Sequence, residues 1–201
     1  ITQLETAKYT NQLMIVSVSD GNAILCLYER NVADKAQESE EWELILETEA
    51  VIGKNGLGKT KEGDAKTPIG VYRFVNAFGI LENPGTKMEY LKVNETHYWV
   101  DDSNSKYYNK LVEDNRIESD WESAEHILEY GDAYHYVLAT SYNVEGIPGK
   151  GSAVFLHCTS ENADATAGCI AVPEVYMREI MKRVEPECVL IIDEVENILK
   201  Y

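Results

Sequence analysis

The sequence predicts a mainly β fold, sandwich-like or barrel-like, with a few inserted α-helices. Strand-forming runs outnumber helical ones along the 201 residues, and most are bounded by Gly, Pro, Asn or Asp. These runs follow one another without the regular alternation of strand and helix that a doubly wound sheet requires. No internal repeat, low-complexity tract or linker divides the chain, so we expect one domain over residues 1–201.

Seven segments have the length and composition of β-strands. The first two are separated by Asp20-Gly21-Asn22, a turn-forming group that favours a hairpin. The predicted strands are residues 12–19, 23–29, 42–53, 70–79, 134–143, 152–158 and 188–194.

Two segments have helical features. Residues 119–130 begin with Ser119, a suitable N-cap, and end before Gly131. Residues 173–184 place Pro173 in a first turn, and their apolar positions fall on one stripe. We expect a helix in each segment.

The chain is strongly acidic, with a formal net charge of −17. Such a surface repels phosphodiester backbones and argues against nucleic-acid binding. The acid is concentrated in residues 34–49 and 113–132, which we interpret as a solvated face. The alternative is that it attracts cationic substrates such as free amines.

No apolar run approaches the roughly 20 residues that cross a bilayer. The sequence begins at Ile1. We therefore expect that the native N-terminus was trimmed and that any export signal or membrane anchor preceded this residue.

The stretch "GKNGLGKT" (residues 53–60) matches a nucleotide-binding loop letter for letter. Such a loop must be followed by a helix whose first turn points at the phosphate. Gly63, Pro68 and Gly70 follow instead, and they are turn residues. We predict no nucleotide site and interpret the lysines as a solvated or substrate-facing hairpin edge.

The four cysteines show no CxxC pair, so the sequence does not indicate a disulfide framework. Cys26 and Cys188 lie in apolar, strand-like runs and are expected to be buried. Cys158 and Cys169 lie in a different setting, next to and twelve residues after His157.

Residues 149–176 contain the residues best suited to catalysis. His157 stands at a predicted strand end, and Cys169 follows a polar loop and Gly168. A nucleophilic cysteine needs a nearby base because a free thiol is mostly protonated at neutral pH, and histidine titrates in the right range. Gly168 allows a tight turn and lets backbone N–H groups face a developing oxyanion. The alternative is a buried cysteine beside a hydrogen-bonded structural histidine.

Two signatures resemble the L,D-transpeptidase family of bacterial cell-wall enzymes. The first is a strand ending in His, a loop, and then the run Thr166 to Ala171 with Gly168-Cys169 at its centre. The second is the turn Thr67-Pro68-Ile69-Gly70-Val71-Tyr72. The resemblance covers about residues 45–193, in a branch with a larger middle insertion, and implies the β-sandwich-like fold of that family.

The resemblance implies a role for each motif residue. Cys169 would attack the third residue of a peptidoglycan stem tetrapeptide, and His157 would act as base and later as acid. Gly168 and Cys169 would offer backbone N–H groups to the oxyanion, and the carbonyl of Cys158 would orient the imidazole. The hydroxyl of Thr166 would either contact the substrate or only shape the turn. Neither metal nor other cofactor is implied, and the substrate places the protein outside the cytoplasm.

Three departures from the family pattern affect the surroundings of this pair. Cys158 stands where Gly is usual, Ala167 where His is common, and Ala171 where Arg or Asn is common. They leave nucleophile and base in place, but they put the holding of a substrate carboxylate in doubt. The alternative function is therefore a catalytically silent cell-wall-binding domain.

Trp99 and Asn143 are further candidates for substrate contact, and for Asn143 a role in holding a turn is equally open. Neighbouring strand residues face opposite sides, so the Cys158 side chain is expected in the core. A redox-sensitive Cys158–Cys169 disulfide is our remaining hypothesis for it. Zinc binding by His157, Cys158 and Cys169 lacks a fourth ligand, and no metal site is predicted.

Overall fold

The computed structural model describes residues 1–31, 41–160 and 164–201, and it is mainly β, as predicted. The strands are β1 (Gln12–Ser19), β2 (Asn22–Asn31), β3 (Glu41–Ala50), β4 (Gly70–Gly79), β5 (Tyr90–Lys92), β6 (His97–Val100), β7 (Leu111–Glu113), β8 (Ala124–His126), β9 (Val137–Thr140), β10 (Phe155–Cys158), β11 (Ile170–Val172) and β12 (Val189–Glu194). The helix α1 (Glu174–Arg183) is joined by the 3₁₀ segments η1 (Thr6–Tyr9), η2 (Asp114–Arg116), η3 (Ile127–Tyr134) and η4 (Val195–Lys200).

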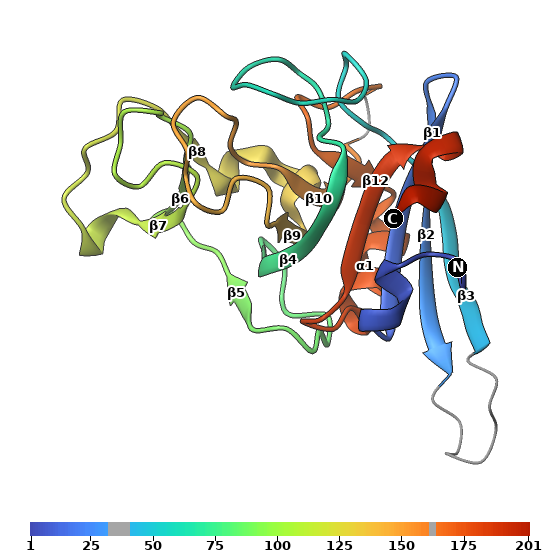
Figure 1. Ribbon diagram of the computed structural model, residues 1–201. Coiled ribbons are helices and arrows are strands. Elements are labelled where there is room, and N and C mark those ends of the chain that lie inside the picture. Colours follow the sequence, from blue (N-terminus) through green and yellow to red (C-terminus); the bar gives the residue numbers. More distant parts are fainter. Residues whose placement is uncertain (32–40, 161–163) are drawn as a thin grey trace.

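One large sheet organises the described part of the chain (Figure 1). Its strands follow the order β11-β10-β9-β4-β12-β1-β2-β3, and β5 pairs with β4. The two ends of this order meet, because Val51, just after β3, exchanges two backbone hydrogen bonds of 2.8 Å with Ala171 in β11. The sheet is therefore nearly closed, which leaves few unpaired strand edges.

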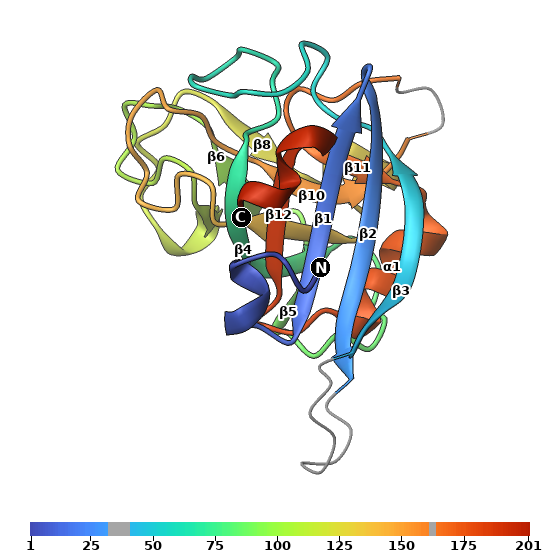
Figure 2. The same ribbon diagram turned by 45° about the vertical axis from the view of Figure 1, so that its right-hand side comes forward.

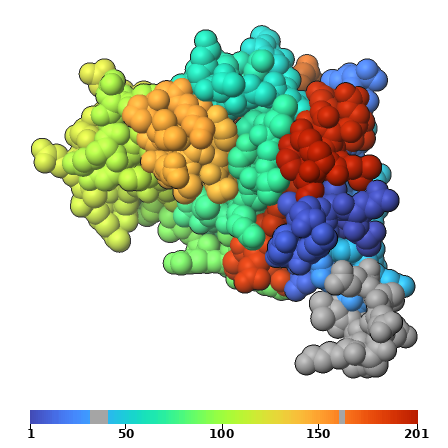
Figure 3. All heavy atoms as spheres, in the orientation of Figure 1, coloured from blue at the N-terminus to red at the C-terminus, as the bar shows by residue number. Residues whose placement is uncertain are grey.

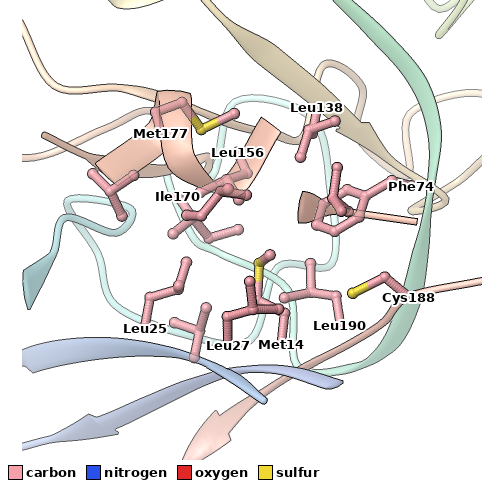
Figure 4. Packing of buried hydrophobic residues seen from close by; sticks show 14 of the residues in the cluster. Met14, Leu25, Leu27, Phe74, Leu138, Leu156, Ile170, Met177, Cys188 and Leu190 are labelled. Atoms are coloured by element: carbon pink, nitrogen blue, oxygen red, sulfur yellow. The ribbon is translucent and has the colours of Figure 1, made fainter. Parts of the chain in front are cut away.

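The inner face of the curved sheet encloses the main core (Figure 4). Met14, Leu25, Leu156 and Leu190 from four different strands meet there, and α1 adds Met177 with Ile180 and Met181. The stripe predicted for residues 173–184 is thus the buried face of α1. Apolar burial of this kind is the main contribution to folding free energy.

The outer face of β1 and β12 is covered by the chain ends (Figure 2). Leu4 and Ala7 near the N-terminus pack there, and the backbone N–H of Thr6 donates to the carbonyl of Tyr201 at 2.8 Å. Both ends are thereby attached to the central strands.

A second sheet, β7-β6-β8, covers the outer face of β9 and β10. It comes from the middle of the sequence and carries Trp99, which packs against Phe155 with ring centroids 4.7 Å apart. Together with η3 it forms one wall of the candidate site described below.

The helix predicted for residues 119–130 is wrong. Residues 124–126 form β8 against β6, and a 3₁₀ segment follows with Gly131 at φ +51°. Upstream, Asp120 accepts the Ser105 hydroxyl at 2.5 Å, so the polar residues of this segment bond outward rather than along a helix. Tertiary pairing overrides a weak local propensity here.

The predicted strands and the predicted helix at residues 173–184 are confirmed, most of them with shifted ends. The seven predicted strands appear, and the hairpin turn uses Asp20 and Gly21, both with positive φ. The helix at 173–184 is α1, with Pro173 at its N-cap. In the described part of the chain, no helix has the length and apolarity needed to span a bilayer. The acidic residues 34–40 lie outside the described residues.

The core predicts a large stability difference between two leucines. Leu190 is fully buried and Leu199 is 64% exposed. Leu190→Ala should lower the free energy of unfolding by about 2–5 kcal/mol, through lost transfer energy and a new cavity. Leu199→Ala should change it by about 0.5 kcal/mol or less. Urea unfolding of both variants measures this, and equal effects would contradict the core assignment.

Candidate active site

His157 and Cys169 open on the same cleft, which has a volume of about 270 Å³. β10 delivers His157, and its parallel partner β11 begins directly after Cys169. Along β10 the side chains alternate: Phe155 and His157 lie on the cleft side, whereas Leu156 and Cys158 lie in the main core. The sequence thus brings its predicted base and nucleophile to one side of the sheet.

The Cys169 thiol is nearly enclosed, with the residue 8% exposed. Its Sγ lies 3.1 Å from the carbonyl oxygen of Ala153, to which the S–H donates, and accepts the backbone N–H of Phe155 at 3.3 Å. Burial raises the pKa of this thiol to about 12, and the nearby Glu125 carboxyl adds to that rise. The Phe155 N–H and the Lys59 ammonium act in the opposite direction. The thiol is therefore protonated at neutral pH.

The His157 imidazole is held in one tautomer. Its Nδ1 lies 2.8 Å from the Cys158 carbonyl oxygen, which can only accept, so Nδ1 carries the hydrogen. Burial lowers the pKa of His157, although hydrogen bonds to the Cys158 and Ala133 carbonyls oppose that effect, so the neutral ring is favoured. Tyr134 packs edge-on to the ring at 5.4 Å and fixes its plane. No hydrogen bond joins His157 to Cys169 within the described residues.

The carbonyl of Cys169 is the meeting point of the two sequence signatures. It accepts the Thr67 hydroxyl at 3.2 Å and the Thr166 hydroxyl at 2.7 Å. Thr67 also accepts the Gly53 N–H at 2.8 Å, which joins the segment after β3 to the cysteine. Thr67 is completely buried, and its contact with Cys169 was not predicted from the sequence.

Gly168 is required by a close approach rather than by an open turn. Its φ is +140°, and a Cβ placed on it would lie 2.7 Å from the Lys66 carbonyl oxygen. Its backbone N–H donates to the Thr166 hydroxyl at 3.1 Å. This donor is therefore engaged, whereas the N–H of Cys169 makes no hydrogen bond with the described residues. The hydroxyl of Thr166 shapes the turn around the cysteine.

Lys59 lines the cleft, although the sequence analysis gave it no role of its own among the lysines of this loop. Its side chain is 3% exposed, and its Nζ forms an ion pair with Asp64 Oδ1 at 3.0 Å. Of the two expectations for these lysines, the solvated one does not hold for Lys59, which lines the cleft as a substrate-facing residue would, whereas Lys54 and Lys61 are exposed. No helix follows Thr60, because residues 61–69 form turns and extended backbone.

Glu125 is another residue of the cleft that the sequence analysis did not identify. It lies in the cleft with Glu62 and Asp101, and its Oε2 accepts the Tyr134 hydroxyl at 2.8 Å. Burial raises the pKa of Glu125 to about 7, and the charges of Asp101 and Glu62 also favour its protonated form, although the Tyr134 hydroxyl favours ionisation. Part of the acidic segment 113–132 therefore lines the cleft instead of solvent.

Three predicted substrate-contact residues do not line this cleft. Trp99 is buried, and its Nε1 donates to Asn109 Oδ1 at 3.0 Å. Asn143 has φ +49°, and its side chain bonds to backbone groups of Ile147 and Gly151, as a residue that holds a turn does. The Cys158 side chain is fully buried in the main core. These positions give direct substrate contact no support.

The placement of Cys158 also bears on two further hypotheses. Its side chain packs in the main core, whereas Cys169 packs with Trp99 and Phe155 on the opposite, outer face of the sheet. A disulfide between the two cysteines therefore has no support. The same separation keeps Cys158 from sharing a metal with Cys169 and His157. Among the described residues no group of three or more His, Cys, Asp or Glu side chains could hold a metal ion.

The comparisons agree with the geometry. The model of the L,D-transpeptidase catalytic domain family (YkuD) matches residues 28–192, which is most of the chain. The chain belongs to the L,D-transpeptidase catalytic domain family. A search of curated proteins finds no match to the sequence.

Among solved structures, the carbamoyl enzyme of Ldtfm with avibactam matches this L,D-transpeptidase domain with a TM-score of 0.44 and 14% identity. The match covers 92% of this chain and 49% of the other, so the chain spans about half of that protein's length. Similarity at this level carries no argument about activity.

The contact at Gly168 predicts a site-specific effect of an added methyl group. Gly168→Ala should displace Cys169 and lower the rate of its alkylation at least about tenfold, because its Cβ meets backbone. Gly63→Ala is the matched control: Gly63 has φ +70°, and its Cβ would meet nothing within 4 Å. That control should cost about 1–2 kcal/mol of stability and leave the thiol unchanged. Peptide mapping after iodoacetamide treatment decides, and equal alkylation rates would contradict this description.

Glu125 predicts a pH-dependent stability. Its pKa is higher in the folded state than the ordinary 4.5, so the folded protein holds this proton more tightly. The resulting stabilisation is complete below about pH 4.5 and is lost as pH rises through about 7, amounting to about 3 kcal/mol at most. The free energy of unfolding, measured with denaturant, should be compared for wild type and Glu125→Gln at each pH. The difference between them should fall as pH rises from about 4.5 to about 7. Glu129→Gln, at a 77% exposed side chain, is the control, and a pH-independent difference for Glu125→Gln would disprove the assignment.

Proposed function

We propose that this chain is a cysteine-dependent L,D-transpeptidase. It would transfer the acyl group of a peptidoglycan stem tetrapeptide through a thioester on Cys169 to an amine of another stem. Transfer to water would give L,D-carboxypeptidase activity at the same site. Family membership supports the reaction class, and the site residues support the cysteine mechanism.

One observation carries the proposal: the thiol of Cys169 and the imidazole of His157 lie on the same cleft. Neither group is charged at rest, so a proton must move from sulfur to nitrogen before attack. The Sγ would first leave the Ala153 carbonyl, with which it shares its hydrogen in the resting site. The Cys158 carbonyl would then stabilise the imidazolium through Nδ1–H.

The acylation step follows from this proton transfer. The thiolate forms a bond to the carbonyl carbon of the third stem residue, and the oxygen becomes an oxyanion. The backbone N–H of Cys169 is available to that oxyanion, whereas the N–H of Gly168 would have to leave the Thr166 hydroxyl. The C–N bond then breaks, and the imidazolium gives its proton to the departing amine of the terminal D-amino acid.

Deacylation repeats the chemistry with a new nucleophile. An acceptor amine or a water molecule attacks the thioester carbon and loses a proton to His157, and the C–S bond breaks. The sulfur recovers its proton from the imidazolium. Glu62, Asp101 and Glu125 give the cleft an acidic lining that favours a cationic acceptor over other ligands.

We further propose that residues 1–201 act as one catalytic unit. The strands β1, β2 and β12 share the sheet that carries β10 and β11, so the residues of β1 and β2 contribute to the scaffold of the site. Because the substrate is cell-wall material, the proposed place of action is the extracytoplasmic side of the membrane.

An acyl adduct tests the mechanism. A carbapenem-type β-lactam should add its full mass to the protein, because ring opening leaves its acyl group on the Cys169 sulfur. Cys169→Ala should abolish the adduct, and His157→Ala should slow it at least about 100-fold. Cys158→Ala is the control, since its buried thiol lies outside the cleft and its backbone carbonyl is retained. Intact-mass spectra measure each.

Defined tetrapeptide muropeptides then identify the product. Cross-linked dimers would show transfer to an amine, and tripeptides would show hydrolysis. Absence of both the adduct and the products would refute the enzymatic proposal and favour the alternative, a catalytically silent cell-wall-binding domain.

A further inference from the structure

Lys59 is buried beside the nucleophile although it belongs to a different part of the chain. Its side chain runs past Gly151, where a Cβ would lie 2.5 Å from Lys59 Cε. It ends beside Gly168, where a Cβ would lie 3.5 Å from Lys59 Nζ. A side chain at Gly151 would displace the lysine, whereas a Cβ at Gly168 would be in ordinary van der Waals contact with its ammonium. Two glycines thus border the path by which an ammonium reaches the residue next to Cys169.

Asp64 holds the ammonium of Lys59 while it also accepts hydrogen bonds from three backbone N–H groups. Its Oδ1 accepts Lys59 Nζ and the backbone N–H of Lys66, and its Oδ2 accepts the N–H groups of Thr60 and Lys61. Although burial opposes ionisation, these donors hold the pKa of Asp64 well below its usual range. An ammonium has three N–H donors, and among the described residues only Asp64 accepts one of them, so two can face the cleft.

The charge of this lysine is unusual in its surroundings. Lys59 supplies the only ammonium among the described residues that line the cleft, opposite the carboxyl groups of Glu62, Asp101 and Glu125. A cysteine thiolate or an oxyanion in that acidic cleft is unstable unless a cation lies close by. The lysine is held where that need arises.

We propose that Lys59, held by Asp64 between Gly151 and Gly168, stabilises the negative charge that develops on the Cys169 sulfur and on the tetrahedral intermediate. Lys59 is thus a positioning and electrostatic residue that acts through the sulfur. This inference rests on the proposed role of Cys169 as nucleophile, but it concerns the electrostatic field at the sulfur, which exists whether or not the chain turns over a stem peptide.

Two alkylating reagents of equal shape measure that field. Iodoacetate is an anion and iodoacetamide is neutral, and both react with the same thiolate. The ratio of their rates at Cys169 therefore cancels the thiolate fraction and the accessibility of the sulfur, and it reports the local charge. Peptide mapping by mass spectrometry separates Cys169 from Cys26, Cys158 and Cys188.

Lys59→Met should lower the iodoacetate-to-iodoacetamide ratio at least about threefold. Lys61→Met is the matched control: it removes an exposed lysine from the same loop and keeps the backbone N–H that bonds Asp64, so its ratio should equal that of wild type. Glu125→Gln should move the ratio in the opposite direction, because it removes a negative charge from the cleft. A purely structural role of Lys59 would leave the ratio unchanged.

The double variant Lys59→Met/Asp64→Asn guards against misfolding, because it leaves no unpaired buried charge. Its ratio should lie below that of wild type but above that of the single variant, because Asp64→Asn also removes a negative charge next to Lys59. A wild-type ratio in either folded variant, or an equal fall in Lys61→Met, would overturn the proposal. β-Lactam acylation is measured separately, so loss of acylation with an unchanged ratio would refute this role of Lys59 and leave the proposed function standing.

Discussion

The carbonyl oxygen of Cys169 is the acceptor on which the whole site depends. Two threonine hydroxyls donate to it, Thr67 from the loop after β3 and Thr166 from the loop before β11. Both loops are also joined through the backbone, since Lys54 N–H donates to the Thr166 carbonyl at 2.9 Å. A buried carbonyl without donors costs free energy, so the two segments lose stability together if either is displaced. This constraint explains why the two sequence signatures occur in one chain.

The loop after β3, which carries Thr67, also connects Cys169 to the surface of the cleft. The loop after β3, teal in the space-filling view, lies beside the segment between β9 and β10, drawn in orange (Figure 3), and the N–H of Glu62 donates to the Gly149 carbonyl at 2.8 Å. Glu62 also accepts hydroxyls from Tyr108 and Ser152. The wall of the cleft is therefore built from segments far apart in sequence. The contacts that place its carboxyl groups join these segments, so a local sequence pattern does not reveal them.

Periodicity and turn residues were enough to predict the strands and α1, because their apolar faces meet one continuous core. The placement of His157 and Cys169 on one cleft agrees with the sequence pattern, since His157 lies near the end of β10 and Gly168 precedes Cys169. The helix prediction for residues 119–130 failed because the side chains of Asp120 and Ser123 and the backbone N–H of Glu122 bond to side chains within residues 101–105, which a local pattern does not reveal. Trp99 has the amphipathic character of a ligand-contact residue, but burial against Phe155 decided its role.

The run "GKNGLGKT" shows how one local pattern can serve different chemistry. Glycines next to a lysine suit any site where the backbone must approach an anion and a cation must reach it. In a phosphate loop the anion is the ligand, and the first turn of a helix shares the task. In this chain the helix is absent from the described loop, and Asp64 instead holds Lys59 beside Gly168. In the role proposed for Lys59, the anion is the sulfur of the protein's own Cys169, so the same letters would serve a different reaction.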